Sequence, residues 1–441
     1  MLAKSVVKKS TYSASKSDAV VFSKRNIPFE VEIMLGNDKV PVTSSKRLLG
    51  VTLDSKLKWH DHVSKQTATC KRLMFLLNKC CKLKWGLNRD ILCHIWTGCI
   101  EHILLYCCSA WLCVLKNTNM VRKIESVQRL IAQKIIKSFK TVSYEAALTL
   151  SGLPPVIGRI HERALSYAVK HPSHYVHRIP NSHIDYTLTL SNNYDIDLKQ
   201  FELLNSISLS PPHLASEPKV STSILSNYPL FQRHAINIYT DGSKTNSGTG
   251  CAFVLFRSTT IEHGQCKLGF DNSVYQAELT AILNSFNHIL TLPIYECFSQ
   301  INIFSDSVAS LLSIKDSQTK NSIAQEIQKF VKFFSLFTSV NFNWCKGHNN
   351  ILGNEMADFF AKESILNPKC MLKELPLPIS HLKSTIKAKS SSAWVNRWQK
   401  SSNGQITHSF IPDIIPKHLI SKTFSHKLTQ VLTGHCKLIS S

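Results

Sequence analysis

The sequence predicts an α/β fold in its second half and a mostly helical region before it. Between about residues 233 and 367, short runs rich in Ile, Val and Phe alternate with longer stretches whose apolar residues recur at helical spacing. This alternation is typical of a mixed sheet with flanking helices. Between about residues 56 and 165, apolar residues recur mainly at intervals of three and four, which indicates helices. A chain of 441 residues is long enough for two or three domains.

The net charge of +23 is concentrated on both sides of a nearly neutral segment. Residues 1–234 carry +16, residues 235–366 carry −2 and residues 367–441 carry +9. A surplus of this size favours a polyanionic partner, so we expect the basic flanking segments to bind nucleic acid. Lysine-rich faces that are simply solvated would give the same values and are the alternative.

Composition also bears on the cellular compartment. No apolar segment of a signal peptide follows the N-terminus, and three ionisable residues interrupt the most apolar stretch, 91–115, which favours a core helix over a membrane span. Eight of the 14 cysteines lie between residues 70 and 113, and none has C-x-x-C spacing. We expect them to be reduced core residues. These features predict an intracellular protein, cytoplasmic or nuclear, that is not secreted and has no membrane partner.

The first half begins with expected strands at 19–23 and 48–53, two β-branched runs bounded by polar turns. Helices are expected from about residue 57 to 140 and beyond, with separate helices at 91–115, 119–139, 143–150 and from 158. One buried stripe of the first helix should contain four residues at i, i+3, i+4 and i+7 spacing, namely Leu73, Leu76, Leu77 and Cys80.

A row of polar residues near the end of this region has two interpretations. Arg129, Gln133, Lys137 and Lys140 would share one helix face and could lie along a phosphate backbone, and a solvated face explains the row equally well. Residues 166–232 are rich in Ser, Asn, Pro and His with weak periodicity, which predicts a linker.

The α/β region predicts five strands in one mixed sheet. The strands are expected at 235–239, 250–256, 261–270, 301–304 and 339–345. The flanking helices are expected at 274–290, 308–315, 321–334 and 352–365.

Four carboxylates in this region lie where chemistry is often placed. Asp241 and Asp306 end predicted strands, and Glu278 and Asp358 lie in predicted helices. Taken singly, each could be a turn residue, a helix cap or a surface acid. Taken together they can meet at one sheet edge and bind Mg²⁺, which prefers oxygen ligands. His348 precedes the last helix in a glycine-containing loop, where it could move protons.

Four motifs occur in order along this region and together resemble a type 1 ribonuclease H domain over about residues 233–367. They are Tyr239-Thr-Asp-Gly-Ser243, Gln276-Ala-Glu-Leu279, Phe304-Ser-Asp-Ser307 and Lys346-Gly-His-x-x-x-x-Gly-Asn-Glu-x-Ala-Asp358. The resemblance implies a ribonuclease H-like fold and cleavage of the RNA strand of RNA–DNA hybrids with two Mg²⁺ ions, or Mn²⁺. It also implies that Asp241, Glu278, Asp306 and Asp358 are catalytic metal ligands and that His348 is the family's mobile histidine.

The chain departs from the family pattern at several positions. Lys346 stands where many members have Pro, and Asn350 where many have Gly, which affects the loop that carries His348. Val274 and Tyr275 stand where bacterial members have adjacent asparagines that contact the hybrid. The sequence Ser-x-Tyr-Gln-Ala-Glu is similar to the version in non-LTR retrotransposons.

The first half resembles the end of the palm and the thumb of retrotransposon reverse transcriptases. The resemblance is carried by residues 15–23, Leu48–Asp54, Trp85–Asn88 and Leu148–Pro154. It implies a palm remnant at 1–55 and a thumb-like region at 56–165. No two aspartates are adjacent in the chain, so polymerase activity is not expected.

Residues 368–441 resemble the basic segment after the nuclease in the same elements, and we expect truncation there. The sequence therefore predicts a hybrid ribonuclease derived from a retrotransposon. A catalytically silent remnant that only binds nucleic acid is the alternative.

Overall fold

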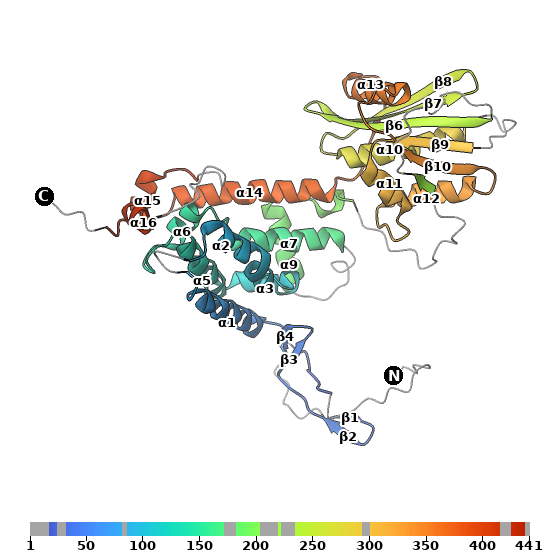
Figure 1. Cartoon of the computed structure of the whole chain (residues 1–441). Coiled ribbons are helices and arrows are strands. Elements are labelled where there is room, and N and C mark those ends of the chain that lie inside the picture. Colours follow the sequence, from blue (N-terminus) through green and yellow to red (C-terminus); the bar gives the residue numbers. More distant parts are fainter. Residues whose placement is uncertain are drawn as a thin grey trace. The chain divides into compact units, whose positions relative to one another are not determined.

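The chain divides into a helical unit and an α/β unit (Figure 1). The computed structural model describes residues 17–23, 32–81, 86–171, 182–202, 219–221, 234–292, 300–414 and 425–436. The helical unit comprises Met1–Leu165, Ile179–Tyr194 and Ile386–Ser441, and the α/β unit comprises Ser166–Arg178 and Asp195–Thr385. The domain boundaries inferred from the sequence stay predictions.

The α/β unit is built on one mixed sheet. Its long strands are β6 (Ala235–Thr245), β7 (Gly248–Arg257), β8 (Thr260–Leu268), β9 (Gln300–Ser305) and β10 (Ser339–Trp344). Two short strands extend the edges: β5 (Lys219–Ser221) pairs with β10, and β11 (Leu372–Lys373) pairs with β8. The α/β class is therefore confirmed, and the five predicted strands are joined by two short edge strands that their sequences did not reveal.

The sheet order among the described residues is β11-β8-β7-β6-β9-β10-β5. Strands β6, β7 and β8 form an antiparallel meander, whereas β9 runs parallel to β6 and β10 runs parallel to β9. Strand β6 therefore lies at the centre, between an antiparallel and a parallel neighbour. Both of its neighbours restrict its register, so each of its side chains has a fixed face.

Helices cover both faces of the sheet. Helix α13 (Leu352–Leu366) lies on one face, and α10 (Val274–Ile289), α11 (Val308–Lys315) and α12 (Ser322–Phe334) lie on the other (Figure 1). Side chains along β6 alternate between these layers. Ile236 and Ile238 are fully buried in the core beneath α10 and α12, whereas Tyr239 is buried in the smaller core beneath α13.

The helical unit begins with two short hairpins. They are β1 (Ile33–Leu35) with β2 (Asp38–Val40), and β3 (Ser45–Leu48) with β4 (Val51–Asp54). The strand predicted at 48–53 is wrong, because the chain turns at Leu49 and Gly50, both with positive φ. The strand predicted at 19–23 is also wrong, since it reduces to a single bridge between Ala19 and Val42.

The helices of this part of the chain follow in sequence order. They are α1 (His60–Leu77), α2 (Arg89–Ile95), α3 (Glu101–Leu104), α4 (Cys108–Trp111), α5 (Thr118–Ile135), α6 (Tyr144–Ser151), α7 (Val156–Lys170) and α9 (Ser182–Asn193). A π-helix at Trp96–Ile100 and 3₁₀ helices at Leu112–Lys116 and Leu198–Gln200 complete them. Helices α14 (Ile379–Gln399), α15 (Gln405–Phe410) and α16 (His426–Leu432) form the C-terminal part. Thus α9, a 3₁₀ turn and β5 lie in the segment predicted as a linker.

The buried face of α1 differs from the predicted one. Met74 and Cys70 are buried, whereas Leu76 is 54% exposed and Cys80 lies beyond the end of the helix. The stripe of Leu73, Leu76, Leu77 and Cys80 is therefore wrong, because the helix packs through the neighbouring stripe instead.

The apolar stretch 91–115 is also not one continuous helix. A π-helical turn and then Cys107, whose φ is +53°, break it into α2, α3, α4 and a 3₁₀ turn. In the described part of the chain, no single helix has the length and apolarity of a membrane span, and only the bent pair Arg89–Leu104 and Cys108–Lys116 meets those criteria together.

Two residues of the polar row at the end of α5 have a structural role. Gln133 Nε2 and the Arg129 guanidinium donate to the backbone carbonyls of Lys140 and Val142. The helix ends at Ile135, and Lys137 has a positive φ of 53°. Lys137 and Lys140 therefore lie outside the helix, and the four residues do not share one helix face. Arg129 and Gln133 instead hold the following loop against α5.

None of the cysteines that the structure describes forms a disulfide. Cys70, Cys93 and Cys108 are buried, as expected of core residues, but Cys80, Cys99 and Cys107 are exposed. The expectation that the whole group lies in the core is therefore wrong for these three.

The burial of α1 gives a direct test. Replacing Met74, which is 1% exposed, with Ala should lower the free energy of unfolding by about 2–5 kcal/mol through loss of packing. Leu76→Ala is the matched control and should cost less than about 1 kcal/mol. Thermal or denaturant unfolding followed by circular dichroism measures both, and a larger loss for Leu76→Ala would restore the stripe predicted from the sequence.

Candidate active site

Two aspartates lie side by side because β6 and β9 are parallel neighbours. The pairing of these strands ends at Thr240 with Ser305, so Asp241 and Asp306 follow at the same edge of the sheet. Asp241 is 7% exposed, and Asp306 is half-buried. The indole of Trp344 at the end of β10 donates to the Asp306 carbonyl over 3.1 Å, which fixes the backbone at the strand end.

Glu278 comes from α10, which begins close to the same edge. Ser273 caps this helix in a capping box with Gln276, in which each side chain accepts from the other residue's backbone N–H. The first turns of α10 press against β6 at Gly242, where a Cβ would lie 2.5 Å from the Glu278 backbone nitrogen. The absence of a side chain at Gly242 thus allows the helix to carry Glu278 up to the strand.

The three carboxylates form one buried group. Asp241, Glu278 and Asp306 each offer an oxygen, and these oxygens lie within 4.8 Å of one another. Glu278 is 4% exposed, and its Oε2 atom has no hydrogen-bond partner among the described residues. A buried carboxylate oxygen without a donor is costly in a protein interior.

Burial, and to a lesser extent the proximity of like charges, raises the pKa values of the group. Burial first, and then the charges of Asp306 and Asp358, raise the pKa of Asp241 to about 7. Burial, together with the charges of Asp241 and Asp306, also raises the pKa of Glu278 well above its usual range. For Asp306, burial is again the main reason for a raised pKa.

This arrangement fits a divalent cation. Oxygen atoms from three carboxylates, one of them unpaired and buried, are the donor set that Mg²⁺ and Mn²⁺ bind. A cation here would satisfy the unpaired Glu278 oxygen and offset the cost of burying three carboxylates close together.

Asp358 belongs to a second group. It lies on α13, and its carboxylate is within 4.8 Å of ligand atoms of His348 and Glu355. Lys362 Nζ, one helical turn along, lies 2.6 Å from Asp358 Oδ2 and serves as its counter-ion. The sequence had placed four acids together, whereas the structure brings three into one group and sets Asp358 beside it, close enough to raise the pKa of Asp241.

The loop that carries His348 has an unusual backbone. His348 is exposed with φ +51°, and Asn350 has φ +56°. A Cβ at Gly347 would lie 2.5 Å from Asp306 Oδ2, so only glycine lets the loop approach this carboxylate. Asn tolerates the left-handed region better than other non-glycine residues, which explains how Asn350 can stand where many ribonuclease H domains have Gly.

Two residues of the site were not identified from the sequence. Glu355 lies three residues before Asp358, and Lys362 lies four residues after it. Both spacings place side chains on one helix face, so helical periodicity around Asp358 could have revealed them.

Comparison with known proteins agrees with this geometry. Residues 233–365 match the RNase H family. The chain contains an RNase H domain. The match covers the five long strands β6 to β10, helices α10, α11 and α12, all but the last residue of α13, and all five predicted site residues.

Curated relatives are retrotransposon proteins. The chain is 26% identical over 140 residues to a Retrovirus-related Pol polyprotein from the type-1 retrotransposable element R1 4 of Nasonia vitripennis, covering 32% of this chain and 35% of that protein. It is 24% identical over 131 residues to a putative 115 kDa protein in the type-1 retrotransposable element R1DM of Drosophila melanogaster, covering 30% of this chain and 13% of that one. The chain thus spans well under half the length of either relative.

Among solved structures, the chain is similar to RNase H1 from the halophilic archaeon Halobacterium salinarum NRC-1. The identity is 17% and the TM-score is 0.25, covering 30% of this chain and 97% of that one.

The raised pKa of Asp241 predicts a pH-dependent stability. In the folded, metal-free protein its pKa is about 7, above the ordinary value of 3.8, so folding stability falls as the pH rises from about 4 to 7. Asp241→Asn removes this cost, and we expect it to raise the free energy of unfolding by on the order of 2 kcal/mol near neutral pH and by little near pH 4.

Thermal unfolding in EDTA at both pH values measures this effect. Glu326→Gln, which removes an exposed carboxylate on α12, is the control and should change stability by less than about 0.5 kcal/mol at either pH. Equal behaviour of the two variants would contradict the raised pKa of Asp241 and the burial to which it is mainly due.

Proposed function

We propose that the RNase H domain hydrolyses the RNA strand of RNA–DNA hybrids with two divalent cations, Mg²⁺ or Mn²⁺. The observation that carries the proposal is the buried group of Asp241, Glu278 and Asp306 with its unpaired Glu278 oxygen. These three residues would hold one ion, and Asp241 together with Asp358 would hold the other. The ions would supply an activated water and charge stabilisation for the leaving oxygen.

The other residues of the site would position and move protons. His348 is exposed on a loop that touches Asp306, so it can take up a proton or assist product departure without being buried. Lys362 would orient the Asp358 carboxylate through their ion pair. Selection of RNA would rest on its 2′-hydroxyls and on the shape of the minor groove.

The remainder of the chain supports a retrotransposon origin. Two curated relatives belong to R1 retrotransposable elements, which supports this origin. Residues 1–55 and 56–165 would be a palm remnant and a thumb-like region of a reverse transcriptase that lacks the polymerase metal site. The basic flanking segments would add salt-dependent affinity for nucleic acid. We place the protein inside the cell, in the cytoplasm or nucleus.

A second function is a hybrid-binding protein without catalysis. The ion pair of Lys362 with Asp358 favours this second function, because the lysine ammonium is bound to the carboxylate that the second metal ion would need. An exposed ion pair is weak, however, so a divalent cation can displace the lysine.

Substitutions at the site separate these functions. Asp241→Asn should abolish Mg²⁺-dependent cleavage of an end-labelled RNA–DNA hybrid and leave hybrid binding largely intact, since a metal ligand is lost while the surface is kept. His348→Ala should slow turnover by about 10²-fold and leave measurable activity.

Single-stranded RNA and duplex DNA serve as control substrates, and Glu326→Gln serves as the control variant. Binding of the hybrid without cleavage in either Mg²⁺ or Mn²⁺ would favour the silent protein. Equal residual activity in the two site variants would contradict their assigned roles.

A further inference from the structure

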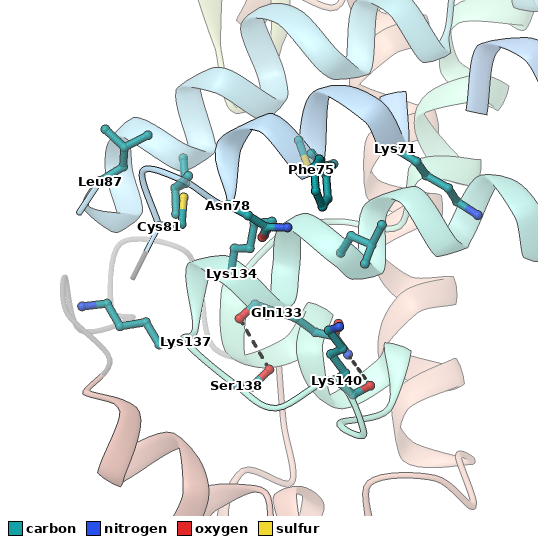
Figure 2. Close-up of a pocket in the computed structure, with 13 residues that line it drawn as sticks. Lys71, Phe75, Asn78, Cys81, Leu87, Gln133, Lys134, Lys137, Ser138 and Lys140 are labelled. Carbon is teal, nitrogen blue, oxygen red and sulfur yellow. Dashed lines mark hydrogen bonds between the residues drawn. The ribbon is translucent and has the colours of Figure 1, made fainter. Parts of the chain in front are cut away.

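A basic pocket lies between α1 and α5 in the helical unit, far along the chain from the RNase H domain (Figure 2). Its volume is about 350 Å³. Four lysines contribute to its wall: Lys71 from α1, Lys134 from α5, and Lys137 and Lys140 from the loop after α5. Figure 2 shows Lys71 and Lys137 on opposite sides of the pocket, with Lys134 between them.

The lysines of this pocket have no acidic counterpart. None of the described residues that line it is Asp or Glu, and no ion pair in the described part of the chain involves these four lysines. Lys134 is half-buried with Nζ directed at Asn78 Oδ1, and burial lowers the pKa of its ammonium group. A partly desolvated cation without a carboxylate is costly, so an anion that entered the pocket would be bound favourably.

The pocket also offers apolar surface. Its floor includes Met74 and Leu92, which are buried, and Leu130, which is half-buried. Phe75 lies toward the middle of the pocket, beside Asn78, and is 68% exposed (Figure 2). An exposed phenyl ring next to ammonium groups is the combination that binds a nucleotide unit, because the ring stacks on the base while the lysines bind the phosphate.

We propose that this pocket binds a single strand of nucleic acid, with a phosphate against the lysines and an unstacked base against Phe75. A single strand is favoured over a duplex because a duplex base must first be unpaired and unstacked, at a cost of about a few kcal/mol, before it can enter a cavity. It is favoured over a lipid surface because the ligand must enter a concave site, whereas a membrane surface is flat. The site is separate from the carboxylate group and does not depend on hydrolysis.

The loop after α5 explains why the lysines gather here. Arg129 and Gln133 bind the carbonyls of Lys140 and Val142, which folds the loop back along its own helix. The positive φ of Lys137 lets the chain leave α5 sharply. Lys137 and Lys140 are thereby placed beside the pocket, where a longer helix would have carried them away from α1.

Binding of an oligonucleotide to the full chain tests the proposal. The protein carries Asp241→Asn and the buffer contains EDTA, so no cleavage intervenes and failure would leave the proposed hydrolysis untouched. The probes are a fluorescent oligo-dT of about 12 nucleotides and an abasic strand of equal length. Lys134→Gln with Lys137→Gln should weaken oligo-dT binding by about tenfold or more at low salt and reduce the slope of log K against log salt by about 1.4.

Matched controls separate the pocket from general charge. Lys65→Gln with Lys387→Gln removes two exposed lysines of the same unit that do not line the pocket, and it should change affinity much less. The base contact is tested by Phe75→Leu, which should abolish a preference of about 5- to 100-fold for oligo-dT over the abasic strand. Phe337→Leu, a similarly exposed ring in the α/β unit, should preserve that preference.

Three outcomes would overturn the proposal. Equal losses in the two lysine double variants would mean diffuse attraction by surface charge. Equal affinity of the parent protein for oligo-dT and the abasic strand would mean that no base is bound. Failure to bind either strand, with binding to phosphatidylserine vesicles that depends on Lys134 and Lys137, would mean a lipid ligand.

Discussion

Burial of three carboxylates close together is the constraint on which the α/β unit depends. Asp241, Glu278 and Asp306 come from a central strand, a covering helix and a neighbouring strand, and the fold holds them within 4.8 Å despite like charge. Such a group persists only where the surrounding packing determines it. Here the paired register of β6 and β9 places the two aspartates. The capping box of α10 and the close approach at Gly242 both position Glu278.

The carboxylate group has buried, packed side chains on one side and exposed basic side chains on the other. Tyr239 and Phe304 stack with ring centroids 4.6 Å apart under α13, next to the two strand ends. His348 and Lys362, by contrast, are exposed and lie on a loop and on the outer side of a helix. The acids are therefore held in place by packing, whereas the two basic side chains beside them are exposed to solvent.

Much of the α/β unit could be predicted from the sequence, because its strands and helices have strong periodicity. Asp306 directly follows β9 as expected, whereas Asp241 lies inside β6, which continues to Thr245 along β7 beyond its predicted end. The five site residues were identified in the same way, and their roles stay predictions. Glu355 and Lys362 were missed because their position beside Asp358 depends on which face of α13 points at the sheet. The edge strands β5 and β11 have two or three residues each and carry no periodicity to detect.

The helical unit was harder to predict for a physical reason. In α1, two apolar stripes compete, and the tertiary contacts that bury Met74 and expose Leu76 are not encoded in spacing. In the stretch 91–115, the continuous apolar pattern did not indicate the break at Cys107. This residue has a positive φ, and no sequence signal marks a cysteine in that conformation. The same limit applies to Lys137, whose backbone conformation ends the row of polar residues.

The register of β6 also bears on how this domain can change during evolution. Asp241 follows directly after the last residue pair of β6 with β9, and side chains along the strand alternate between two differently packed layers. Loss or gain of one residue between Ala235 and Asp241 would turn the carboxylate to the layer of Ile236 and Ile238. This strand can therefore diverge by substitution but not in length, whereas the turn between β6 and β7 is free to accept insertions.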